Sequence, residues 1–341
     1  MKHSTVLLFV LLAFATPILA QEKFKVLAVR GSVTLDGSRK ISVGQKLKLS
    51  EKIVVAKGGY ASLAHLNGRT VEVRKEGTVK VSDLDKAVSK STGSVSGKFA
   101  SYVVGELTEV SEPIAFKDSR RSKMRTTGSV ERAAGDEVNV ADSILRMVGA
   151  PGELQALAAI ESSQIGSGET FTIVMPRHTR LLNDTVQFMW HRSNKIARYK
   201  VVITDRDDKV VAARETTDTA LTLVMKDVSV ASGGLYYWHV EKSDDASERT
   251  QEYGLWLLNG QDKQTAVDLI VAVRGDMEEQ SSAIGALVLA TAYEDQGLFY
   301  DAYRSYLLAM KEAPDVQSYK RLYTEFLLRQ SLNLEAYIAY N

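Results

Sequence analysis

The chain has 341 residues, with 43 Lys and Arg against 42 Asp and Glu, and no cysteine. This length predicts two or three domains, and a hydrophobic share of 45% is that of a globular protein rather than of a disordered chain or a membrane bundle. The missing cysteines exclude thiol nucleophiles, disulfides and Cys-ligated metal sites. A net charge of +1 gives no overall electrostatic attraction for nucleic acid, so we expect no nucleic-acid partner.

Residues 1–20 have the pattern of a secretory signal peptide. Lys2 precedes an apolar run over residues 6–15, Pro17 follows it, and cleavage is expected near Ala20. The run is shorter than the roughly 20 residues that span a bilayer, and no later stretch comes close to that length. We therefore expect a periplasmic or extracellular mature chain with no transmembrane segment. An uncleaved membrane anchor is the alternative.

Residues 21–85 predict a small all-β domain, because polar and apolar residues alternate there and glycine interrupts them at short intervals. The pair Asn67-Gly68 suits the positive φ angles of a type I′ turn and predicts a tight hairpin. Glu72 and Arg74 should point to water. Four apolar residues should form the buried face of the hairpin: Ala61, Leu63, Val71 and Val73.

Several short motifs mark this stretch: Gly31-Ser32-Val33 with Asp36-Gly37, Val43-Gly44 with Leu47, Ile53, and the hairpin from Gly59 to Val71. Over about sixty residues these motifs resemble the FecR-type β domain of bacterial envelope proteins. Full-length FecR-like regulators add a cytoplasmic segment and a transmembrane helix, which we do not find in this sequence. The resemblance therefore implies the extracytoplasmic β module and not the anti-sigma role.

Residues 86–168 form a helical and basic connecting region. Apolar residues recur every three to four positions in Lys98–Val110, which predicts a short helix packed on the β domain. The basic excess of the chain lies between Lys117 and Arg132, in a stretch with little apolar content. A solvated linker is the favoured interpretation, and a docking site for an acidic polymer is the alternative. Two more helices are expected at 138–148 and 151–162.

Residues 169–260 predict a β-sandwich, since seven short alternating segments are separated by turn residues. The positions of the large residues in these segments resemble a fibronectin type III domain. That resemblance implies that the tryptophan and tyrosine at the family's positions fill the core between two sheets. The residues that carry it are Pro176, Trp190, Tyr199, Leu223, Tyr236, Trp238 and Val240.

Residues 261–341 change to a helical period. From Ala286 to Pro314, small and aromatic residues follow the order of the 34-residue tetratricopeptide repeat, with Gly297 at the turn between two helices. A second, truncated repeat should follow. The resemblance implies α-helical hairpin repeats with a groove for protein partners, and the alternative is that this end only packs on the sandwich. Groove positions carried over are Leu287, Thr291, Glu294, Arg321, Glu325 and Leu328.

No motif for chemistry emerges. The histidines beyond the first few residues are His65, His178, His191 and His239, and no two have the spacing of a metal site. Phosphate-binding loops and nucleophile elbows are absent from the sequence, and aspartates cluster only at expected turns, where a weak calcium site is the alternative. We expect no catalytic, metal or cofactor-binding residues, no cofactor and no enzyme.

The expected fold class is therefore a multidomain chain of β plus α type, with a small N-terminal all-β domain, a central sandwich and C-terminal helical hairpins. The expected function is a non-enzymatic interaction or scaffold component of a bacterial envelope. One alternative is a glycan- or peptidoglycan-binding protein, in which an exposed Tyr60 stacks on sugar rings. The other is the sensor module of a FecR-type pathway, which requires a membrane partner.

Overall fold

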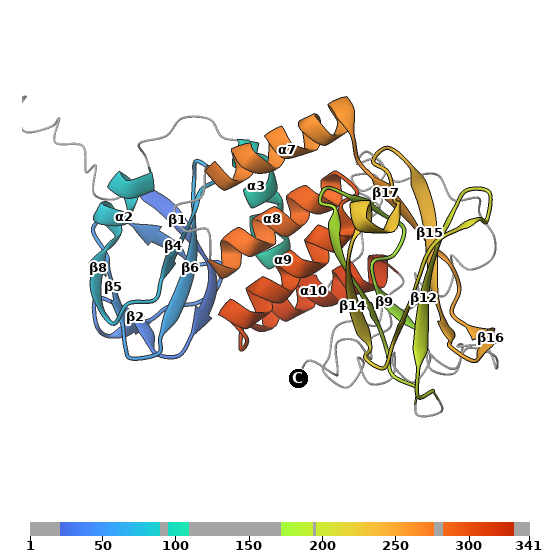
Figure 1. Cartoon of the computed structure of the whole chain (residues 1–341). Helices are drawn as coiled ribbons and strands as arrows, with labels where there is room; N and C mark the ends of the chain where they lie inside the picture. Colours follow the sequence, from blue (N-terminus) through green and yellow to red (C-terminus); the bar gives the residue numbers. More distant parts are fainter. Residues whose placement is uncertain (1–20, 89–94, 109–171, 194–195, 276–281, 331–341) are drawn as a thin grey trace, which may run out of the picture. The chain divides into compact units, whose positions relative to one another are not determined.

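The computed structural model describes residues 21–88, 95–108, 172–193, 196–275 and 282–330 (Figure 1). The chain divides into two units, Met1–Thr108 and Glu109–Asn341, and each is described by itself. The expected signal peptide, the basic linker and the expected helices at 138–148 and 151–162 lie outside the described residues. In the described part, no helix combines the length and apolar character needed to span a bilayer.

The first unit contains two four-stranded antiparallel sheets, ordered β4-β1-β6-β7 and β3-β2-β5-β8, with apolar residues of both sheets in one core. The helix α3 contacts β1 and buries Phe99, Val103 and Leu107, as the sequence predicted for Lys98–Val110, whereas Tyr102 is 42% exposed. The elements are β1 (Glu22–Arg30), β2 (Val33–Leu35), β3 (Arg39–Lys40), β4 (Lys46–Lys48), β5 (Lys52–Val55), β6 (Tyr60–His65), β7 (Thr70–Val73), β8 (Gly77–Lys80), α2 (Val81–Val88) and α3 (Val95–Thr108).

The hairpin of β6 and β7 confirms the prediction from Asn67-Gly68. Ala61 pairs with Val73 and Leu63 with Val71, and all four side chains are buried. Gly68 has a φ of 85°, a conformation that glycine adopts without steric cost. The turn therefore sets the register that places the apolar face toward the core.

The prediction that Glu72 points to water is wrong. Its side chain is 1% exposed, because the carboxylate accepts hydrogen bonds from the Tyr60 hydroxyl at 2.8 Å and from Arg74 Nε at 2.7 Å. These two donors replace water around the buried charge. Tyr60 itself is 1% exposed, so it offers no surface on which a sugar ring can stack.

His65 joins the hairpin to α2. Its Nδ1 accepts a hydrogen bond from the Asn67 amide at 3.2 Å, so the proton resides on Nε2, which lies 2.9 Å from Asp85 Oδ1. Lys23 lies 3.3 Å from the same carboxylate oxygen. These contacts support a structural role for this histidine.

The second unit begins with two sheets, one of order β10-β17-β15-β12-β13 with β16 on β15, and one of order β14-β11-β9 (Figure 1). Their side chains meet at Phe188 and Trp238, with ring centroids 4.5 Å apart. The strands are β9 (Ile173–Met175), β10 (Thr179–Leu181), β11 (Thr185–Trp190), β12 (Tyr199–Asp205), β13 (Val210–Thr216), β14 (Ala220–Val224), β15 (Leu235–Lys242), β16 (Asp245–Arg249) and β17 (Tyr253–Leu257).

All seven expected segments of this region contain strands, and two strands were not predicted. One is β16, which lies where the sequence indicated a turn. The other is β10, which pairs with β17 in parallel, with Thr179 opposite Leu255. The aromatic residues expected in the core are buried there, and Trp190 and Tyr199 are in ring contact at 5.5 Å.

Helices follow in α7 (Gly260–Gly275), α8 (Ala283–Asp295), α9 (Phe299–Glu312) and α10 (Gln317–Arg329). Gly297, at a φ of 67°, lies in the turn between α8 and α9, and α9 ends just before Pro314. The described chain is thus a multidomain β plus α protein with a helical C-terminal region. The start of α10 lies 34 positions after the start of α8 (317 against 283).

The strand β10 connects the sandwich to the turn between α8 and α9. The Arg180 amide donates to the Gly297 carbonyl at 3.0 Å, and the Tyr300 amide donates to Thr179 Oγ1 at 3.2 Å. The Arg180 guanidinium donates to the Gln296 carbonyl at 3.0 Å. The helical end therefore packs on the sandwich, the alternative raised by the sequence, and the partner groove stays a prediction.

Candidate functional site

The six predicted groove residues lie on α8 and α10. Leu287 is fully buried and Thr291 nearly so, with the Thr291 hydroxyl donating to the Val288 carbonyl at 2.8 Å. These two side chains therefore offer no surface to a partner in the described chain. Glu294, Arg321 and Glu325 are partly buried, and the side chain of Leu328 lies outside the described set.

Glu294 links three helices through its carboxylate. It accepts hydrogen bonds from the Tyr306 hydroxyl of α9 at 2.7 Å and from Arg329 of α10 at 2.9 to 3.1 Å on both oxygens. A bidentate guanidinium pair of this kind fixes geometry as well as charge. This predicted site residue therefore has a role in holding α8, α9 and α10 together.

Arg321 and Glu325 form an ion pair one turn apart on α10, at 2.9 Å. Glu294 pairs instead with Arg329, a residue that the sequence did not single out. The side chains of Glu294, Arg321 and Glu325 are each charged and 14 to 16% exposed.

Asp301 is a titratable residue that the sequence did not single out. It lies in the first turn of α9, and burial raises its pKa from 3.8 to about 6, although Arg304 and Arg274 act in the opposite direction. Arg274 also donates to the Tyr293 hydroxyl at 2.9 Å, and burial raises the pKa of that tyrosine. The sequence did not reveal this burial, because aspartate is common in the first turn of exposed helices.

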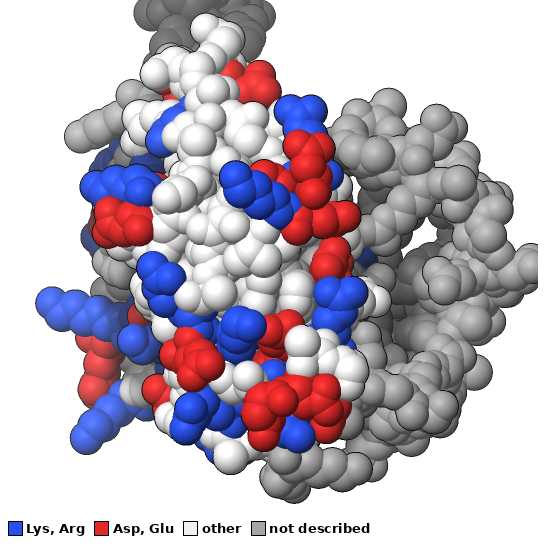
Figure 2. Space-filling view, turned by 45° about the vertical axis from the view of Figure 1, so that its right-hand side comes forward, with Lys and Arg blue, Asp and Glu red and all other residues white. Residues whose placement is uncertain are grey.

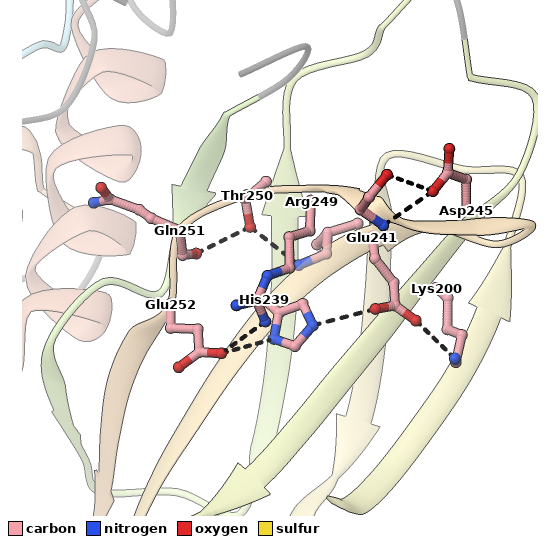
Figure 3. A network of polar contacts seen from close by, with 10 residues as sticks. Lys200, His239, Glu241, Asp245, Arg249, Thr250, Gln251 and Glu252 are labelled. Atoms are coloured by element: carbon pink, nitrogen blue, oxygen red, sulfur yellow. Dashed lines mark hydrogen bonds and ion pairs between the residues drawn. The ribbon is translucent and has the colours of Figure 1, made fainter. Parts of the chain in front are cut away.

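A second polar cluster lies on β15, on the face of the sheet directed away from the sandwich core (Figure 3). Glu241 lies between Lys200 of β12, at 2.7 Å, and His239 Nε2, at 3.4 Å. His239 Nδ1 lies 3.6 Å from Glu252, which also binds Arg249 at 3.0 Å. Burial is the main cause of a lowered pKa at His239, and Glu241 acts in the opposite direction.

In these clusters Lys200, Arg249 and Arg329 each lie within ion-pair distance of a carboxylate, which offsets part of the cost of burying the charge. Across the described ranges, no group of three or more His, Asp or Glu residues is placed to hold a metal ion. On the molecular face shown in Figure 2, Lys and Arg are interspersed with Asp and Glu, so no large area of one sign stands out there.

Comparison with known proteins gives little. No family model matches the chain, and no curated protein is significantly similar to it. Among solved structures, a β-1,2-glucanase from Parabacteroides distasonis is similar over 43% of this chain and 24% of its own, at 13% identity and a TM-score of 0.22. The chain thus spans about a quarter of that protein, and a match at this TM-score supports no statement about fold or activity.

Proposed function

We propose that this protein is an exported, non-enzymatic interaction component of a bacterial cell envelope, with a FecR-like β domain, a fibronectin type III-like sandwich and tetratricopeptide-like helices. The observation that carries the proposal is the spacing between two helices. A shift of 34 residues relates the start of α8 to that of α10, which is the length of the tetratricopeptide repeat. Stacked repeats of this kind bind protein partners along one face.

The fixed position of the helical end supports this proposal. Main-chain and side-chain hydrogen bonds from β10 hold the turn of the first helical hairpin against the sandwich. Preorganisation of this sort lowers the entropy lost when a partner binds. Of the predicted groove residues, Arg321 and Glu325 are the ones we assign to partner contact.

The test is crosslinking and affinity capture from native envelopes with the full chain and two variants. Arg321→Glu breaks the ion pair on α10, whereas the double exchange Arg321→Glu with Glu325→Lys restores an ion pair in reversed orientation. If a partner binds to these two charged side chains, both variants should fail to capture it, while their circular dichroism spectra match that of the parent. Capture that is lost in the single variant and regained in the double one would show that the pair only stabilises the helix.

A parent chain that elutes as a monomer and yields no crosslinked partner would contradict the proposal directly. The two sequence-based alternatives, a glycan-binding protein and a FecR-type sensor, stay predictions. The specific residue suggested for sugar stacking, Tyr60, is excluded from that role by its burial.

A further inference from the structure

Trp256 differs in exposure from the other two tryptophans of the chain. Trp190 and Trp238 are 3% and 0% exposed, whereas Trp256 is 48% exposed. Its neighbours along β17, Leu255 and Leu257, are buried in the sandwich. Because side chains alternate along a strand, the indole lies on the opposite, outer face of the six-stranded sheet.

A second apolar side chain stands directly beside this indole. Leu235 of β15 is opposite Trp256 in the antiparallel register and is 39% exposed, and Arg180 of β10 is opposite on the other side. Opposed residues share a face of the sheet. The row thus places an aromatic ring between an aliphatic and a cationic side chain on the outer face.

Gly254 lies next to this row, opposite Tyr237 in the strand register, and three side chains surround its Cα. At Gly254, two positions before Trp256, a Cβ would lie 3.8 Å from both Leu235 and Tyr237 and 3.5 Å from His178 Nδ1. The same His178 nitrogen accepts a hydrogen bond from the Gly254 amide at 3.2 Å, which orients the ring. Trp256, Leu235, Tyr237, His178 and Gly254 therefore form one surface, here named the Trp256 platform.

The polar groups of the platform are mostly neutral or already paired. Arg180, at its border, already donates to a main-chain carbonyl and lies 3.4 Å from Asp262. Its aromatic members carry neutral polar atoms, the indole N–H and the Tyr237 hydroxyl. A charged ligand gains little at such a surface, whereas a neutral ligand with one apolar face and a hydroxyl edge matches it.

We propose that the Trp256 platform binds neutral saccharides, with the C–H face of a pyranose ring stacked on Trp256 and its hydroxyls bonded by the polar atoms around it. An open sheet face suits a flat ring, since no enclosing cavity is needed. This site lies on the sandwich and does not depend on the partner contact proposed for α10.

Intrinsic fluorescence offers a direct assay, because Trp256 is the one tryptophan that a soluble quencher reaches readily. The full chain is titrated with neutral hexasaccharides of glucose and of N-acetylglucosamine while acrylamide quenching is followed. We expect a saturable fall in quenching with at least one of them. Calorimetry then compares variants, with an expected loss of affinity of about tenfold for Trp256→Ala and a smaller loss for Leu235→Ser.

Val271→Ala is the matched control, because this valine is exposed to 62% but lies on α7, and it should bind saccharide as the parent does. The Arg321→Glu variant should also keep saccharide binding, which separates this site from the one on α10. The proposal is overturned if no hexasaccharide alters quenching, if a proline-rich peptide protects Trp256 instead, or if protection rises with protein concentration in the absence of sugar. Equal affinity of parent and Trp256→Ala would overturn it as well.

Discussion

Replacement of Asp301 by asparagine should stabilise the second unit at neutral pH. The carboxyl group has a pKa of about 6 in the folded chain, against 3.8 for an ordinary exposed aspartate, chiefly because it is buried. Between these values the folded chain binds the proton more tightly than the unfolded chain does. The free energy of unfolding therefore falls as the pH rises from about 4 through about 6, and the loss is recovered below about pH 4.

The gap between 3.8 and about 6 corresponds to an upper limit of ~3 kcal/mol, at about 1.4 kcal/mol per pH unit. Relaxation around a charged carboxylate reduces such penalties in real proteins, so we expect Asp301→Asn to gain about 1.5 kcal/mol at pH 7.5. That gain equals about 3 to 6 °C in Tm for a unit of this size. Because asparagine does not ionise, the gain should shrink to near zero at about pH 4.

The assay is urea unfolding of the parent and of Asp301→Asn, followed by circular dichroism at 222 nm between about pH 4 and pH 8. Asp268→Asn is the control, since it makes the same exchange at a carboxylate that is exposed on α7. A difference between Asp301→Asn and the parent that is constant with pH would refute the reasoning. A variant less stable than the parent at pH 7.5 would do so too, because it would show that the charged carboxylate stabilises the fold.

Three further substitutions test the packing contacts. Gly297→Ala forces a side chain into a φ of 67° beside β10 and should cost about 1 to 2 kcal/mol, seen as a lower urea midpoint for the helical signal. Trp238→Phe removes the 2.9 Å hydrogen bond from the indole N–H to the Pro176 carbonyl and reduces the buried side-chain volume. We expect the free energy of unfolding to fall by about 2 to 3 kcal/mol in the same titration. His65→Ala removes the contact with Asp85 and should raise amide hydrogen exchange in the turn between β6 and β7 by about tenfold.

Local patterns in the sequence predicted several elements whose partners are close along the chain, although the short strand β16 beside β15 was missed. The hairpin at Asn67-Gly68 is an example, because its turn and its alternating apolar residues belong to one short segment. The helical turn at Gly297 is another. In both, a backbone conformation that favours glycine coincides with a change in side-chain pattern, so the element and its buried face follow from the same few residues.

Elements that depend on distant partners were not predicted. The three residues of β10 form a strand only because β17 and the turn after α8 supply hydrogen-bond partners, and both lie far along the chain. The burial of Glu72 depends on Tyr60, whose hydroxyl reaches the carboxylate from the neighbouring strand. The groove prediction failed at Leu287 and Thr291 for a similar reason. A repeat pattern identifies equivalent positions on helices, but it does not show which of those positions are buried.

The position of β10 also affects the order in which the second unit forms. Thr179 and Gly297, joined at 3.3 Å through the threonine hydroxyl, are 118 positions apart. During synthesis, the β10 edge therefore has no final partner until the chain beyond α8 has been made. Contacts of such long sequence separation are slow to form because a large loop must close first. We expect docking of the helical end to be a late folding event, and a truncation within the helices to leave behind a sandwich with an uncovered, association-prone strand.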